Sequence, residues 1–271
     1  MKAILQLFSL TIAISLVLSC SEESGSVIDQ LTGLTPANDV QLGLSVVAQI
    51  EADPVNYPIL SESEYPEAYA YIQDMTSNIV SSNDVRFKDL FHYSEVKIID
   101  ADVLNAFATP GGFIYVYTGL IKYLDTADDL AGVMGHEIAH ASERHSSSQM
   151  KKQMGITLLS QVILGEASAS QLAQMATGFF ALKFSRNDEA ESDEYSVIYL
   201  SDTDYACNGA ATFFEKLTSE GQSSGPEFLS THPSPASRVE DINSKANDIN
   251  CNTSTIVESG MNYDQFKASL P

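Results

Sequence analysis

The 271-residue sequence predicts an α+β fold that is mostly helical and contains a small β-sheet. Apolar residues recur at helical spacing over much of the chain, whereas clear strand-like alternation is confined to residues 112–118. With 44% hydrophobic and 18% charged residues, the chain can bury a sizeable core. We therefore expect one folded domain over residues 37–271, preceded by two segments of a different kind.

Residues 1–19 have the composition of an export signal. Lys2 is followed by a nearly unbroken apolar run, and the small Ser19 precedes Cys20. The pattern resembles the bacterial lipoprotein signal, in which the cysteine becomes the lipidated N-terminus. An ordinary secretory signal and a short membrane anchor are the alternatives. We expect residues 20–36 to be a flexible tether, and Cys20 to hold the protein in the cell envelope, on the periplasmic side or cell surface of a bacterial membrane.

Net charge, the lengths of apolar runs and cysteine content indicate which partners and which covalent cross-link to expect. Acidic residues outnumber basic ones 36 to 14, so a nucleic-acid-binding role is not expected. After residue 20 no apolar run reaches the ~18 residues of a spanning helix, which leaves the lipid as the only expected membrane contact. In an oxidising compartment Cys207 and Cys251 could form a disulfide, and two buried thiols are the alternative.

The first elements of the domain follow from spacing and turn residues. Residues 37–52 and 65–82 carry apolar side chains at helical spacing, with prolines between the two segments. Residues 96–100 read as a short strand, and residues 112–118 as a clearer one that follows a Pro-Gly-Gly turn.

The later elements are predicted to be helical. Thr126 and Asp129 form a helix-capping pattern, and apolar residues follow at helical spacing through Ala141. Residues 150–183 show interrupted helical spacing, a further helix is expected over residues 188–200, and the remainder alternates short helices with turns.

The segment His136-Glu137-Ile138-Ala139-His140 carries the strongest chemical signal. On a helix, residues four apart lie on one face, one turn apart. Two imidazoles so placed can bind one Zn²⁺, and the intervening Glu137 can accept a proton from water activated by the metal. The capped helix and the apolar neighbours favour a metal site over two solvent-exposed histidines beside a solvated glutamate.

The residues after His140 bear on the class of zinc site. A metzincin would have Gly and His where this chain has Glu143 and Ser146. His145 would lie about 140° around an unbroken helix from His140, so we expect it to point elsewhere, as an ordinary polar residue near the helix end.

A third ligand is expected downstream, within residues 184–193. Glu189 and Asp193 are four residues apart, so Glu189 could ligate zinc while Asp193 accepts the free N–H of a ligating histidine. Glu191 would face away from this pair. An exposed acidic helix is the alternative.

Four motifs follow one another along the chain. They are Asn105–Gly112 leading into Phe113-Ile114-Tyr115-Val116, Gly135–His140, Ser185-Arg186 with Glu189 and Asp193, and Thr231-His232-Pro233 with Arg238. In this order the motifs resemble the HtpX-like and CAAX-prenyl-protease-like zinc endopeptidases, which are gluzincins. Within this family the chain looks most like the lipoprotein branch of LoiP-type and BepA-type proteases.

The resemblance implies a zincin-like fold in which the sheet lies beside the helix of the two histidines. It also implies one Zn²⁺ per chain, bound by His136, His140 and Glu189, with Glu137 as the general base.

The resemblance places His232 near the metal. There it could act catalytically by stabilising the developing oxyanion, or it could occupy the open zinc position and hold the enzyme inactive. A structural histidine in a tight turn is the alternative. Arg238 could anchor this loop by pairing with an acid.

Zincins commonly offer a sheet edge to an extended substrate, so the strand beginning Gly112-Phe113-Ile114-Tyr115 is expected to pair with it. Such a strand needs one free edge.

Together these features predict a zinc metalloendopeptidase of the bacterial cell envelope that hydrolyses unfolded or misassembled proteins. The main rival is an envelope chaperone or assembly factor whose zinc site is structural or closed, with residues 150–183 folded over the cleft. A simple binding lipoprotein, which would hold no stoichiometric zinc, is a third hypothesis. The sequence leaves the oligomeric state open.

Overall fold

The computed structural model describes residues 34–219, 227–232, 237–255 and 260–271. The predicted signal, the lipidation site Cys20 and most of the predicted tether lie outside these residues. The expectation that residues 34–36 belong to the tether is wrong, because they belong to the folded domain. Leu34 is buried, and Thr35 caps the first described helix through a reciprocal pair of hydrogen bonds with Asn38.

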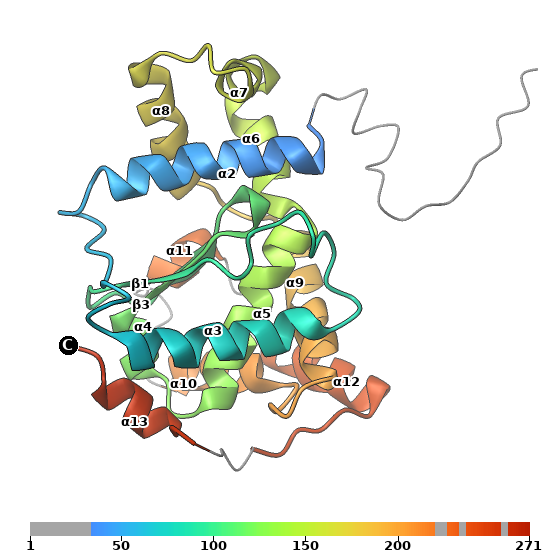
Figure 1. The fold of residues 1–271 in the computed structure, drawn as a ribbon. Coiled ribbons are helices and arrows are strands. Elements are labelled where there is room, and N and C mark those ends of the chain that lie inside the picture. The colour runs from blue at the N-terminus through green and yellow to red at the C-terminus, as the bar shows by residue number, and fades with distance from the viewer. Residues whose placement is uncertain (1–33, 220–226, 233–236, 256–259) are drawn as a thin grey trace, which may run out of the picture.

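The described elements confirm a mostly helical α+β fold with one small sheet (Figure 1). The predicted helices and strands are present to within a few residues at each end. The helices are α2 (Pro36–Glu51), α3 (Pro66–Ser81), α4 (Thr118–Tyr123), α5 (Ala127–Ser142), α6 (His145–Met154), α7 (Ile156–Ile163), α8 (Ala169–Phe180), α9 (Arg186–Ser201), α10 (Gly209–Ser219), α11 (Glu227–Thr231), α12 (Arg238–Ile249) and α13 (Tyr263–Ala268).

Within the described residues the sheet has three strands in the order β1-β3-β2. β1 (Val96–Ile99) runs parallel to β3 (Ile114–Tyr117), and β2 (Ala106–Ala108) pairs with β3 in the antiparallel sense. β3 is therefore the central strand. The expectation that Gly112, Phe113, Ile114 and Tyr115 offer a free edge to the substrate is wrong, because β1 and β2 occupy both sides of this strand and Gly112 lies in the preceding turn. The edge strand nearest the candidate site is β2, which sequence spacing did not reveal.

A tight turn, η1 (Pro110–Gly112), connects β2 to β3. Gly111 and Gly112 have φ values of 76° and 84°, a region that residues with a Cβ rarely adopt. The turn packs against α2, and a Cβ on Gly111 would lie 2.7 Å from the Cα of Val40.

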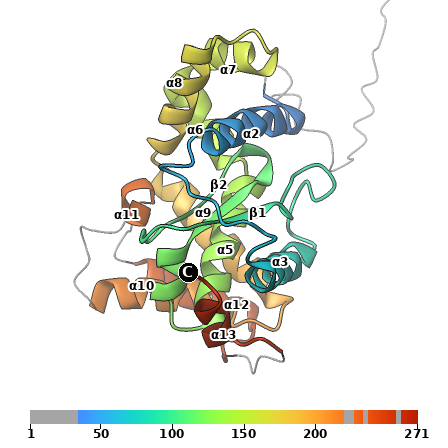
Figure 2. The ribbon, with the colours of Figure 1, turned by 60° about the vertical axis from the view of Figure 1, so that its left-hand side comes forward.

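The two faces of the sheet pack against different hydrophobic clusters. Ile114 and Val116 join the larger cluster, with α3, α5, α9 and α10, whereas Tyr115 and Tyr117 join the smaller one, with α2, α7 and α8. Figures 1 and 2 show α2 and α3 on opposite sides of the sheet, with α7 and α8 beyond α2. Residues 150–183 thus form a separate helical layer beyond α2, and this layer reaches the sheet where Phe179 and Phe180 contact Phe107 of β2.

Helix α5 lies at the centre of the domain, and every one of its residues is buried. Its N-terminus has the predicted capping box of Thr126 and Asp129. Close packing against α10 requires a glycine, since a Cβ on Gly132 would lie 2.0 Å from the backbone nitrogen of Ala210. Among the described residues, no helix combines the length and apolar character needed to cross a bilayer.

A disulfide joins Cys207, before α10, to Cys251, after α12. The two cysteines are 44 positions apart, so the bond links the two ends of the α10–α12 region.

Candidate metal centre

Helices α5 and α9 place the predicted zinc ligands in one buried cluster. His136, Glu137 and His140 project from α5, and Glu189 projects from the first turn of α9. His232 reaches the same point from the residue directly after α11. One ligand atom from each of His136, His140, Glu189 and His232 lies within 4.8 Å of the other three.

The donor atoms converge at short distances. His136 Nε2 and His140 Nε2 are 3.0 Å apart, and His136 Nε2 and His232 Nδ1 are 3.4 Å apart. Glu189 Oε1 lies 3.5 Å from His140 Nε2 and 3.0 Å from His232 Nδ1. Imidazole nitrogens and a carboxylate oxygen are among the donors that bind zinc in proteins.

The protonation states of the three predicted ligands also fit a cation. Burial lowers the pKa of His136 and of His140, which favours the neutral imidazole that binds metal. Burial alone would oppose ionisation of Glu189, but His232 and His140 hold its pKa well below the ordinary value. Nitrogen lone pairs and a carboxylate charge therefore converge on one buried point, where Zn²⁺ would fit.

Asp193 and Arg238 support His136 from behind. His136 Nδ1 donates to Asp193 Oδ1 at 2.9 Å, which leaves Nε2 as the ring's lone-pair donor towards the cluster. Arg238 in turn donates to both carboxylate oxygens of Asp193 and lies 3.0 Å from Glu189 Oε2. Burial works against ionisation of Asp193, but the charge of Arg238 keeps its pKa below the ordinary value.

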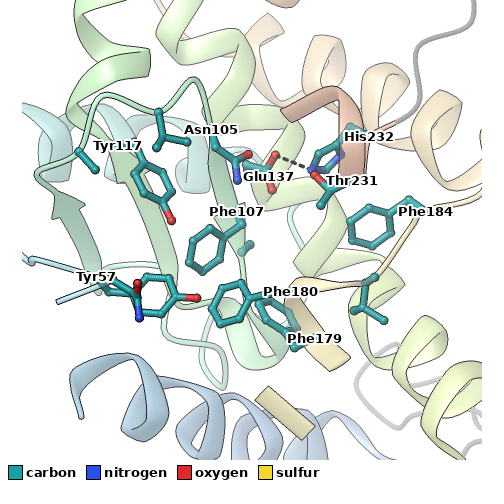
Figure 3. Close-up of a pocket in the computed structure, with 15 residues that line it drawn as sticks. Tyr57, Asn105, Phe107, Tyr117, Glu137, Phe179, Phe180, Phe184, Thr231 and His232 are labelled. Atoms are coloured by element: carbon teal, nitrogen blue, oxygen red, sulfur yellow. Dashed lines mark ion pairs between the residues drawn. The ribbon is translucent and has the colours of Figure 1, made fainter. Parts of the chain in front are cut away.

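His232 lies between the ligand cluster and Glu137. Its Nδ1 faces Glu189. Its Nε2 is 3.6 Å from Glu137 Oε1, and Figure 3 marks this ion pair with a dashed line. Burial disfavours a charged ring, but Glu189 and Glu137 raise the pKa of His232 above its ordinary value. The ring stacks on Phe228 with centroids 4.4 Å apart, so α11 holds it in place.

Glu137 is buried beside the cluster. Burial raises its pKa to about 7, against the opposing charge of His232. Its Oε1 has no hydrogen-bond partner among the described residues. A carboxylate with this pKa and a free lone pair is suited to accept a proton near neutral pH.

The expectation that His145 points away is wrong. Helix α5 ends at Ser142, and Arg144 adopts a left-handed conformation (φ 62°) that starts α6 in a new direction. This bend returns His145 to the site, where its Nδ1 lies 3.1 Å from His140 Nδ1. Its Nε2 lies 3.1 Å from Glu191 Oε2, so Glu191 contacts His145, which in turn contacts His140.

Sequence spacing also missed an aromatic cavity that opens beside Glu137 (Figure 3). Phe107 from β2, Phe179 and Phe180 from α8, and Tyr57 after α2 line it. These residues come from three separate segments, so only the Phe179-Phe180 doublet was a local signal.

Comparison with known proteins agrees with this geometry. The sequence profile of Peptidase family M48 matches residues 45–246. The Beta-barrel assembly-enhancing protease of Escherichia coli (strain K12) is 31% identical over 231 residues, which cover 79% of this chain and 45% of that protein. Metalloprotease LoiP of the same strain is 29% identical over 188 residues, covering 67% of this chain and 71% of LoiP.

A mitochondrial relative extends the comparison beyond bacteria. Mitochondrial metalloendopeptidase OMA1 of Arabidopsis thaliana is 33% identical over 144 residues, which cover 53% of this chain and 30% of that protein. The chain thus spans less than half of the length of the Beta-barrel assembly-enhancing protease and about a third of OMA1. The family profile nevertheless covers well over half of the chain, which therefore belongs to peptidase family M48, a family of zinc metalloproteases.

Proposed function

We propose that the protein is a zinc endopeptidase of the bacterial cell envelope that hydrolyses peptide bonds in unfolded or misassembled proteins. The observation that carries this proposal is the buried convergence of His136, His140 and Glu189 beside Glu137. The predicted lipoprotein signal supports the location, as does a bacterial relative whose name refers to β-barrel assembly.

His136, His140 and Glu189 would hold the metal, each oriented by further contacts. Bound zinc supplies a Lewis acid that polarises the scissile carbonyl and lowers the pKa of a water molecule. Glu137 takes a proton from the attacking water as the water oxygen adds to the carbonyl carbon. Glu137 then delivers that proton to the leaving nitrogen as the C–N bond breaks.

The edge of β2 is the best-placed docking strand for an extended substrate. The backbone groups of Asn105 and Thr109 form hydrogen bonds with Tyr117 and Phe113, towards β3. Because backbone groups alternate in direction along an antiparallel strand, those of Ala106 point away from β3, to the outer edge of the sheet. The buried Oδ1 of Asn105 has no hydrogen-bond partner among the described residues, so it could accept a substrate N–H.

A specific observation favours the second candidate, a chaperone or assembly factor with a closed site. His232 adds a fourth donor to the cluster, and zinc sites with four protein ligands are normally structural. Ala106 is completely buried, and the N–H of Phe228 in α11 donates to Leu104 O at the end of the β2 edge. Peptide cleavage would therefore require α11 and His232 to move.

The test compares the wild type with Glu137→Gln, which has nearly the same shape but cannot accept the proton. We expect both proteins to bind about one zinc per chain, and cleavage of an unfolded protein to fall by a factor of about 10²–10⁴ in the variant. Glu189→Ala should lose or weaken zinc binding. Normal cleavage by Glu137→Gln would contradict the mechanism.

His232→Ala separates the two candidates. Removing the fourth donor from a closed protease should raise cleavage while zinc stays bound through the remaining three ligands. If zinc is bound but neither the wild type nor His232→Ala cleaves unfolded protein, the non-proteolytic candidate is favoured.

A further inference from the structure

The aromatic cavity beside Glu137 runs from the protein surface to the candidate active site. Its volume is about 300 Å³. Asn56 at its outer end is exposed and Val103 is half-buried, whereas Glu137 and His232 at its inner end are each 1% exposed. A group that enters the cavity therefore approaches the proton acceptor of the proposed reaction.

Aromatic contacts hold the wall of the cavity in a defined shape. Phe180 stacks on Tyr57 with ring centroids 5.0 Å apart, and its ring meets Phe107 at 90° with centroids 5.5 Å apart. Phe107 also stacks on Tyr115 of the central strand, with centroids 4.9 Å apart. The wall is thus continuous with the sheet, and an entering ring would meet other rings at edges and faces.

The cavity suits a large apolar side chain in size and in charge. A cavity of about 150 Å³ lined by apolar residues is enough to bind benzene. Among the described residues that line it, the carboxylate and imidazole groups are those of Glu137 and His232, both at the inner end, and none is Lys, Arg or Asp. The amide and hydroxyl groups of the lining are neutral. A charged substrate side chain would lose its hydration against the aromatic wall without gaining an opposite charge there.

We propose that this cavity binds a bulky apolar side chain of the substrate, aromatic or large aliphatic, next to the bond that is cleaved. The proposal rests on the proposed endopeptidase function and defines its substrate class. Large apolar side chains are buried in folded proteins and become available when a chain is unfolded or misassembled. The cavity would therefore select unfolded segments through the residues that a folded protein conceals.

The chain contains no tryptophan, so a tryptophan in a peptide can report on binding without background. The experiment uses the zinc-loaded, full-length Glu137→Gln variant and a blocked peptide of Gly, Ser and Thr with one central Trp. We expect a blue shift of the Trp emission that saturates with protein concentration. A peptide with Leu in place of Trp should compete, and a peptide with Asp should compete at least 10-fold more weakly.

Two variants in the Glu137→Gln background locate the binding site. Val103 is a half-buried residue of the cavity lining, so the larger side chain of Val103→Phe would fill part of the cavity. This variant should weaken peptide binding at least 10-fold. Val80→Phe, at a half-buried position of α3 outside the cavity, is the matched control and should leave binding unchanged. If Val103→Phe does not fold, Phe180→Ala tests the same wall and should also weaken binding about 10-fold.

Equal competition by the Leu and Asp peptides, or unchanged binding after both Val103→Phe and Phe180→Ala, would overturn the proposal. Cleavage is measured separately, by identifying the bonds that the wild type cuts in an unfolded protein. Cavity-dependent binding without cleavage would count against the endopeptidase function alone. Cleavage without preference for bulky apolar residues would count against the cavity proposal alone.

Discussion

Arg238 donates two hydrogen bonds to Asp193, from Nη2 to Oδ1 at 2.5 Å and from Nε to Oδ2 at 2.7 Å. The same Oδ1 accepts the hydrogen bond from His136 Nδ1. Arg238 is 2% exposed and also lies over the Phe214 ring, 3.9 Å from its centroid. The planar guanidinium therefore fixes the orientation of Asp193, and Asp193 fixes the orientation of His136.

Arg238→Lys should weaken zinc binding by a factor of about 10–100, the usual effect of removing a group that orients a metal ligand. Lysine keeps the charge but cannot form the two-pronged contact with Asp193. Competition with a zinc chelator measures the affinity. Lys245→Met on the same helix removes a more exposed ion pair with Glu194 and should leave zinc affinity unchanged. Equal zinc affinity in wild type and Arg238→Lys would exclude this orienting role.

His145→Ala should also weaken zinc binding by a factor of about 10–100, because His140 would lose the partner of its Nδ1. His145→Gln offers a carbonyl acceptor and should restore part of the affinity. Glu191→Gln changes only the outer contact of His145 and should have a smaller effect. If His145→Ala and His145→Gln lose zinc affinity equally, loss of the hydrogen bond to His140 is not the cause.

Local spacing was sufficient to predict His136, His140, Glu189 and Asp193 as groups on helical faces, because residues four apart share a face of any helix. It failed for His145 because the direction of the chain there depends on Arg144. The Arg144 side chain reaches back to Asp39 on α2, 105 positions away, and such a contact leaves no periodic pattern.

The prediction that β3 is an edge strand failed because strand order, like the direction of the chain at His145, depends on contacts between distant segments. β2 has three residues, too few for alternation to identify a strand. β3 has clear alternation, but its position between β1 and β2 depends on which segments pair in space. The motif containing Ala106, Phe107 and Ala108 was visible in the sequence, whereas its role as an edge strand required the observed pairing.

Alkaline pH should unfold the protein, because burial raises the pKa of Tyr93, Tyr115 and Tyr199. Unfolded tyrosine ionises near pH 10, so the stability contributed by these neutral phenols is present below about pH 10 and is lost as the pH rises towards the folded-state pKa values.

The absence of tryptophan makes tyrosinate absorbance a clean probe of this transition. Part of the absorbance change should coincide with loss of the circular dichroism signal. Tyr115→Phe should move the unfolding midpoint to higher pH, because one ionisable group is removed. Ionisation of all 12 tyrosines near pH 10 with the dichroism intact would contradict the prediction.

Replacing both cysteines of the disulfide, Cys207→Ser with Cys251→Ser, should lower the free energy of unfolding by about 3–4 kcal/mol in the chain-entropy model for a loop of this length. The bond lies outside the metal cluster, so zinc stoichiometry should not change. Denaturant unfolding in saturating zinc, with and without a reducing agent, measures the effect. Reduction should destabilise the wild type by a similar amount and leave the double variant unaffected, because the variant has no bond to break. Equal unfolding of oxidised and reduced wild type would show that the two cysteines do not stabilise the fold by bonding to each other.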